Sequence, residues 1–198
     1  MGVKTSGGSG AGKGAAQSDK ALAAELAQAK NSAAAQNTLK KIAQKCEKRV
    51  TNKLKKKGVS FPLSGQDCRN AGIAKHKCCE KMVKAAGNPP VQAEVPLDSA
   101  GKDVSEEYRK ARKMASRVCR KAGERGLNTK GMWGTVFKAN APNVSIVADV
   151  VFTDQNGQKF GFDFKFPCGT NPPKWGKNGQ KRRYSKIFGA GNIGLISP

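Results

Sequence analysis

The sequence predicts a mixed α/β (α+β) fold, in which a mixed central β-sheet is flanked by helices and preceded by a basic helical segment. Apolar residues recur with helical spacing in residues 38–57, 71–86 and 104–122. Residues 144–152 and 159–166 instead have the apolar content or the alternation of β-strands. A short stretch of turn-forming residues joins these two strands, so we expect a β-hairpin.

Length and charge set the first limits. The 198 residues suit one ordinary domain, with room for a small second one. Lysine and arginine number 37 against 14 acidic residues, so the net charge is +23, which favours a nucleic acid, an anionic membrane or an acidic protein as partner. No apolar run is long enough for a transmembrane helix, and the first residues have no apolar core of a secretory signal.

We expect three segments along the chain. Residues 1–36 are rich in Gly, Ala and Ser and are predicted to be a flexible leader. Residues 37–98 form a basic helical segment, whose helix 38–57 carries lysines on one face. That face is either a solvated surface or a surface for phosphates. A Pro-rich, extended seam near residues 88–100 leads into a C-terminal domain, residues 99–198.

The histidine and cysteine content limits the possible chemistry. His76 is the one histidine, so sites built from several histidines are excluded. Any hydrolytic site must then rely on carboxylates, lysine and a metal. Cys68, His76 and Cys78 or Cys79 could hold zinc, but their spacing fits no common zinc pattern. We expect reduced, half-buried thiols in preference to disulfides.

The helix that begins near residue 104 has a predicted start signal. Asp103 is a candidate N-cap and Glu106 its reciprocal partner. Glu107 borders the apolar stripe, so it is the acid of this helix that could reach inward.

The turn between the two strands decides which residues face one another. Phe160, Phe162, Phe164 and Phe166 share one face of the second strand, and Asp163 and Lys165 share the other. A two-residue Asn156-Gly157 loop would put Asp149 opposite Phe164. A type I turn from Asp154, with Gly157 in the left-handed conformation, would put Asp149 opposite Asp163. The second register is the reasonable one on local grounds.

Two facing carboxylates repel each other unless a cation lies between them. Oxygen ligands suit Mg²⁺, Mn²⁺ or Ca²⁺. Lys165 would lie beside that cation, where it could orient a phosphate or an attacking water. Asp149, Asp163 and Lys165 therefore predict metal-assisted hydrolysis of a phosphodiester.

These residues resemble a known signature. Asp149 followed by Asp163-Phe164-Lys165 is similar to the motif of the PD-(D/E)xK restriction-endonuclease-like nuclease superfamily. Residues 180–184, QKRRY, resemble the QxxxY motif of part of that superfamily and would lie on a short helix with Ile187 and Phe188. The surrounding sequence resembles nuclease modules of bacterial polymorphic toxins, including type VI secretion effectors. The sequence departs from the pattern in having no proline directly before Asp149 and Asp instead of Glu at position 163.

The resemblance implies roles for single residues. Asp149, Asp163 and the Phe164 carbonyl would bind Mg²⁺ or Mn²⁺, and Lys165 would position or activate water. Gln180 and Tyr184 would orient the substrate strand or the lysine. The family often adds a glutamate from a preceding helix, for which the candidates in order are Glu107, Glu106 and Glu124. Contacts to the substrate backbone are expected from Lys174, Lys177, Lys181, Arg182 and Arg183.

The resemblance also implies a biological setting. Residues 99–198 would be the nuclease domain of a Mg²⁺-dependent deoxyribonuclease toxin, made in the bacterial cytoplasm, secreted without a signal peptide and active in the cytoplasm of a competitor cell. We expect DNA as substrate, an acidic immunity protein as partner, a secretion carrier bound through the leader, and no membrane insertion. The alternatives are a ribonuclease that uses the same site, a non-catalytic nucleic-acid-binding protein and, more remotely, a membrane-active toxin.

Overall fold

The computed structural model describes residues 10–87, 89–168, 172–176 and 179–198. Three helices come first: α1 (Gly10–Ala27), α2 (Ser32–Lys56) and α3 (Gly65–Ala85). Strand β1 (Val91–Leu97) leads to the helical pair α4 (Ser105–Glu124) and α5 (Met132–Asn140). The hairpin β2 (Ile146–Thr153) and β3 (Lys159–Phe164) follows, and the chain ends with α6 (Gln180–Phe188), the short helix η1 (Ala190–Asn192) and β4 (Ile193–Ile196).

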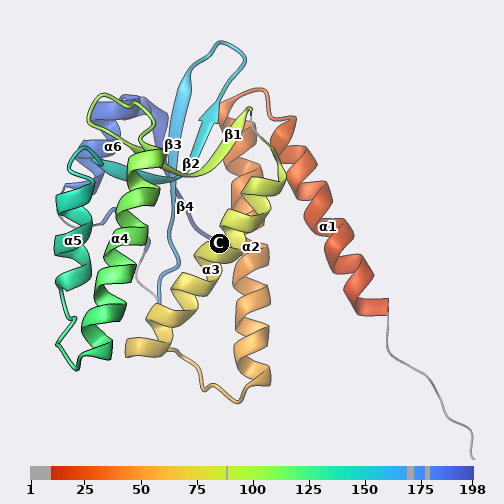
Figure 1. Ribbon diagram of the computed structural model, residues 1–198. Helices are drawn as coiled ribbons and strands as arrows, with labels where there is room; N and C mark the ends of the chain where they lie inside the picture. Colours follow the sequence, from red (N-terminus) through yellow and green to blue (C-terminus); the bar gives the residue numbers. More distant parts are fainter. Residues whose placement is uncertain (1–9, 88, 169–171, 177–178) are drawn as a thin grey trace, which may run out of the picture.

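The four strands form one mixed sheet in the order β1-β2-β3-β4. Strand β2 is antiparallel to both β1 and β3, and β4 runs parallel to β3. In Figure 1, helices α1 to α3 gather on one side of the molecule and α4, α5 and α6 on the other. The mixed α+β class with a mixed sheet is thus confirmed, and the strand in residues 91–97 lies within the segment predicted to be an extended seam.

Two apolar clusters cover the two faces of the sheet. The larger cluster joins α1, α2 and α3 to the face of β3 that carries Phe162 and Phe164. The smaller cluster places Tyr184 and Phe188 of α6 against β1 and β2. Phe162 and Phe164 therefore point away from α6, as the alternation predicted, and the opposite face of β3 is the one that meets α6.

Helix α1 contradicts the prediction that residues 1–36 form a flexible leader. Ala23 and Leu26 are buried, and Leu26 belongs to the larger cluster. Asp19 accepts ion pairs from Lys45 and Arg49 of α2 at 2.8 and 2.9 Å. This part of the predicted leader is therefore a packed helix. Residues 1–9 of it lie outside the described residues.

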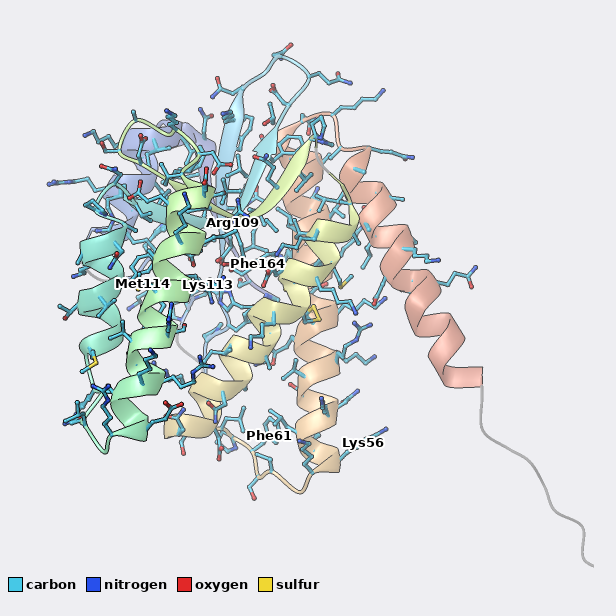
Figure 2. All side chains as sticks on the ribbon, viewed as in Figure 1. Lys56, Phe61, Arg109, Lys113, Met114 and Phe164 are labelled. Carbon is cyan, nitrogen blue, oxygen red and sulfur yellow. A yellow bond between two sulfur atoms is a disulfide. The ribbon has the colours of Figure 1, made fainter. Side chains whose placement is uncertain are left out.

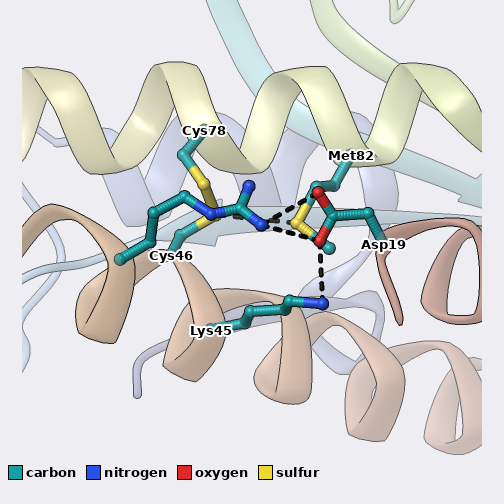
Figure 3. The surroundings of a disulfide bond; sticks show 6 residues. Asp19, Lys45, Cys46, Cys78 and Met82 are labelled. Atoms are coloured by element: carbon teal, nitrogen blue, oxygen red, sulfur yellow. Dashed lines mark hydrogen bonds and ion pairs between the residues drawn. A yellow bond between two sulfur atoms is a disulfide. The ribbon is translucent and has the colours of Figure 1, made fainter. Parts of the chain in front are cut away.

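The expectation of reduced thiols is wrong for four of the six cysteines. Cys46 and Cys78 join α2 to α3, as Figure 3 shows beside Asp19 and Met82. Cys68 of α3 is joined to Cys168, which follows β3. Cys68, which both versions of the candidate zinc set require, thus has a sulfur partner, so the set cannot form. Cys79 and Cys119 are free, and burial raises the pKa of the Cys79 thiol.

Among the described residues, no helix combines the length and the apolar character needed to span a membrane.

Candidate active site

The turn between β2 and β3 has the predicted form. The Gly157 N–H donates to the Asp154 carbonyl at 3.1 Å, and the Asp154 N–H donates to the Gln158 carbonyl at 3.0 Å. Gly157 has a φ of 78°, which is the left-handed conformation that favours glycine. The Asp154 carboxylate also accepts from the Asn156 N–H at 2.9 Å, which explains the aspartate at the first position of the turn.

The register of the hairpin follows from this turn. Val150 pairs with Phe162 at the end of the ladder, and Asp149 and Asp163 are the next residues of the two strands. Beyond that pair, the Asp149 carboxylate accepts the Phe164 N–H at 2.7 Å, so a side chain of β2 bonds to the backbone of β3. The alternative with a two-residue loop is excluded, and the hairpin brings the two acids to adjoining positions.

Asp163 is a buried carboxylate, with only 4% of its surface exposed. Burial and the neighbouring Asp149 carboxylate raise the pKa of Asp163, and the Lys165 ammonium opposes that rise. The structure thus holds two acids close together at a cost that only a nearby cation reduces.

Lys165 and Gln180 complete a connected polar group around Asp163. The Lys165 ammonium lies 2.5 Å from Oδ2 of Asp163. The Gln180 amide donates to Oδ1 of the same carboxylate at 3.0 Å, and its carbonyl oxygen accepts from Lys165 at 3.3 Å. The Gly176 N–H donates to that oxygen as well, at 2.6 Å. Gln180 therefore sets the positions of both the acid and the lysine.

Tyr184 is placed to hold α6 against the sheet. Its side chain is buried, and its hydroxyl donates to the Val147 carbonyl of β2 at 3.3 Å. Burial raises the pKa of this phenol, so the hydroxyl stays protonated and remains a donor. Because so little of its surface is exposed, we assign Tyr184 to positioning α6, which carries Gln180, and not to contact with a substrate strand.

The acids predicted to supply a third carboxylate lie elsewhere. Glu107 accepts from the backbone and side-chain N–H groups of Asn143 at 3.2 and 3.1 Å, so it ties α4 to the loop before β2. Glu106 pairs with Lys110 at 2.7 Å instead of closing a capping box. Glu124 lies 4.0 Å from Arg120 on the surface. Helical periodicity indicates which of these residues face inward, but it does not indicate where α4 lies relative to the sheet.

His76 is a member of the site that the sequence did not place there. Its Nδ1 lies 3.4 Å from Oδ2 of Asp149, and its ring meets the Phe166 ring edge-on at 5.3 Å. Burial works against the charged imidazole, but the contact with Asp149 outweighs this effect and raises the pKa of His76. The signal in the sequence was a lone histidine on a helix, which is more often structural than functional.

Glu94 is the second residue that was missed. It has a φ of 53°, the one positive φ of a non-glycine residue in the described parts of the chain. The β1–β2 register pairs Ala93 with Val150 and Val95 with Ala148, which leaves Glu94 and Asp149 as the interrupted pair between them. Burial and Asp149 raise the pKa of Glu94. Strained backbone next to a polar site is a recurrent feature of functional sites.

The donors of this site suit a divalent cation by type more than by number. Among the described residues, no three or more His, Cys, Asp or Glu side chains gather closely enough to hold a metal by themselves. Oδ2 of Asp163 is buried and has the Lys165 ammonium 2.5 Å away, so this carboxylate already lies beside a cation. Mg²⁺ commonly uses one or two carboxylates together with water and substrate phosphate. Asp149 and Asp163 fit that pattern by donor type.

Four of the five basic residues expected to contact the substrate backbone lie within the described residues. Lys174, Lys181, Arg182 and Arg183 are exposed around the start of α6, next to Gln180. Lys177 lies outside the described residues.

No family model, no curated protein and no solved structure matches this chain.

Proposed function

We propose that the chain is a metal-dependent deoxyribonuclease with a restriction-endonuclease-like core. The observation that carries the proposal is the grouping of Asp149, Asp163 and Lys165 where β2 and β3 meet, with Gln180 of α6 bonded to both the acid and the lysine. The motif resemblance and the charge of +23 support the same proposal from the sequence alone.

Each residue has a task in this proposal. Asp149 and Asp163 would hold Mg²⁺, with the Phe164 carbonyl as a further ligand. The bound cation would supply Lewis-acid stabilisation of charge on the phosphoryl oxygens. Lys165 lies within reach of the same carboxylate, so its ammonium is placed to bind the scissile phosphate or orient the attacking water. Gln180 holds Lys165 and Asp163 at their working separation.

His76 is proposed as a positioning residue. It contacts the Asp149 oxygen that also accepts the Phe164 N–H. Two donors on one carboxylate oxygen restrict its orientation, so the other oxygen has a defined direction. Loss of an outer-shell partner of this kind commonly lowers metal affinity or activity about 10–100-fold.

The biological setting is proposed on the same terms. A nuclease active in its producer must be inhibited, and an inhibitor that faces this net charge should be acidic. Delivery into another cell takes a protein through oxidising surroundings, in which the two disulfides would persist. An inhibitor whose binding surface is neutral and remote from Asp149 and Asp163 would contradict this part.

A cleavage assay separates the proposal from its rivals. Supercoiled plasmid is incubated with the protein in Mg²⁺ and in EDTA, next to the Asp163→Asn variant, and RNA of matched length is tested in the same salt. We expect DNA cleavage that needs both Mg²⁺ and Asp163. DNA binding without cleavage would favour the non-catalytic binding protein, which the net charge alone also supports. Cleavage of RNA only would favour the ribonuclease.

A further inference from the structure

Helices α2 and α4 both carry many cations and are candidates for a phosphate-binding surface. The contacts of α1 distinguish the two helices. On α2, Lys41 pairs with Glu25 at 2.6 Å, and Lys45 and Arg49 pair with Asp19. The acids of α1 thus already neutralise part of the α2 surface. The cations of α4 have much less compensation.

Helix α4 presents a predominantly basic face. Its exposed cations are Arg109, Lys110, Arg112, Lys113, Arg117, Arg120 and Lys121. Acidic partners are confined to Glu106 for Lys110 and Glu124 for Arg120. Within the described part of the chain, no carboxylate lies within ion-pair distance of Arg109, Lys113, Arg117 or Lys121. These four recur every fourth residue, so they form a stripe about 18 Å long.

The packing of α4 explains why this face stays free of protein. Its buried residues are Ala111, Ala115 and Ala122, on the opposite side of the helix. The small alanine side chains let α4 pack closely against the rest of the protein, while the long basic side chains remain exposed. Like charges in adjacent turns destabilise a helix. A partner that carries negative charge would remove that cost.

The start of α4 is bonded to β1, the strand that pairs with β2 of the candidate active site. The charge of Arg112 acts on Glu94 of β1, and Glu94 lies opposite Asp149 in the sheet register. In Figure 2, Arg109 and Lys113 are on the side of α4 that faces α3. Arg109, the first residue of the stripe, bonds to the Ser105 carbonyl in the first turn of α4, directly after the Val104 N–H that donates to the Pro96 carbonyl of β1 at 3.0 Å.

We propose that Arg109, Lys113, Arg117 and Lys121 form a track for the phosphodiester backbone of duplex DNA, which leads one strand toward Asp149 and Asp163. The inference rests on the proposed nuclease function and names where its substrate lies. Over about 18 Å of duplex axis, one strand presents about five phosphates, a number that four cations can match. The stripe complements the exposed cations at the start of α6.

The test compares two variants of equal charge. One carries R109Q, K113Q, R117Q and K121Q on α4, and the control carries K40Q, K48Q, K53Q and K56Q on exposed positions of α2. Affinity for a 20-base-pair DNA duplex is measured in EDTA by fluorescence anisotropy over a series of NaCl concentrations. We expect the slope of log K against log salt to fall by about 3–4 in the α4 variant, since each lost phosphate contact removes about 0.9. The control should lose less than about one.

Equal losses in the two variants would reduce the effect to net charge and overturn the proposal, as would an unchanged slope in the α4 variant. Circular dichroism checks that both variants fold. If the fourfold α4 variant does not fold, R109Q and K113Q alone should each lower the slope by about 0.9. Because binding is measured without metal, the two proposals can fail separately. If the protein never cleaves DNA but the α4 substitutions lower the salt dependence of binding, the α4 surface is upheld and the nuclease proposal fails. A chain that cleaves DNA with an unchanged KM after the α4 substitutions retains the nuclease but not the track.

Discussion

Gly161 of β3 offers a test of how α6 supports the site from a distance. A Cβ added at this position would lie 2.3 and 2.4 Å from the Cε2 and Cδ2 atoms of Phe188. Carbon atoms pack at about 3.5–4.0 Å, so Phe188 would have to retreat by at least about 1 Å. Gly161 pairs with Val151 on one side and Ile193 on the other, so β3 itself has little freedom to move.

The Gly161→Ala substitution should therefore lower the free energy of unfolding by about 1–3 kcal/mol, the usual cost of overpacking. Because Phe188 lies on α6 with Gln180, the displacement should also disturb the Gln180 bonds to Asp163 and Lys165. A misplacement of about 1 Å can lower the rate about 100-fold. Urea unfolding followed by circular dichroism measures the first effect, and plasmid cleavage measures the second.

Two further variants make this prediction specific. Gly123→Ala in α4 has nothing within 4 Å of the added Cβ, so it should leave stability unchanged or raise it by about 0.5–1 kcal/mol. Phe188→Leu in the Gly161→Ala background should recover part of the loss, with a coupling energy of about 0.5–3 kcal/mol. A Gly161→Ala protein that unfolds at the wild-type urea concentration and cleaves at the wild-type rate would refute the reasoning.

Three more predictions follow from the site and its supports. His76→Ala should lower cleavage about 10–100-fold while His76→Asn, which keeps a donor near Asp149, recovers part of it; equal rates for both variants would contradict the positioning role. Alkylation of the unfolded protein should label two cysteines before reduction and six after it, and six labelled cysteines without reduction would disprove both disulfides. Because the Cys68–Cys168 disulfide closes a long loop, Cys168→Ser should lower the free energy of unfolding by about 3–5 kcal/mol. Burial would raise the pKa of Asp19, but the ion pairs with Lys45 and Arg49 outweigh it and lower this pKa, so the stability that Asp19 contributes is present above the ordinary carboxyl pKa and is lost as the pH falls through the lowered value. Asp19→Asn should therefore lower the free energy of unfolding by about 1 kcal/mol at pH 7 and leave it unchanged at the acid end. A loss of stability that is independent of pH would argue against the ion pairs.

The features that sequence predicted well are those set by neighbouring residues. The aspartate and glycine of the β2–β3 turn determine its type, and the type determines the register down to Asp149 and Asp163. The four-residue spacing of Gln180 and Tyr184 likewise predicts the helix that the structure contains at Gln180–Phe188. Local chemistry was enough at these two points to bring most of the candidate site together.

The features that were missed depend on contacts between distant segments. Strand β4 is four residues long and is stabilised by parallel pairing with β3, so nothing in its own sequence distinguishes it. The partners of Cys68 and Cys46 lie 100 and 32 residues away. Glu94 acquires its place from the register of β1 against β2, whereas Glu107 was chosen from the periodicity of its own helix. A helix face shows which residues point inward, but not which part of the protein they meet.

The most direct measurement is plasmid cleavage by the purified protein with Mg²⁺, with EDTA and with the Asp163→Asn variant, alongside a binding measurement on the same samples. The account predicts nicking or degradation that disappears with EDTA and with the substitution, while both proteins still bind the DNA. Retained binding with no cleavage in any sample, DNA or RNA, would contradict the central claim and leave a basic nucleic-acid-binding protein.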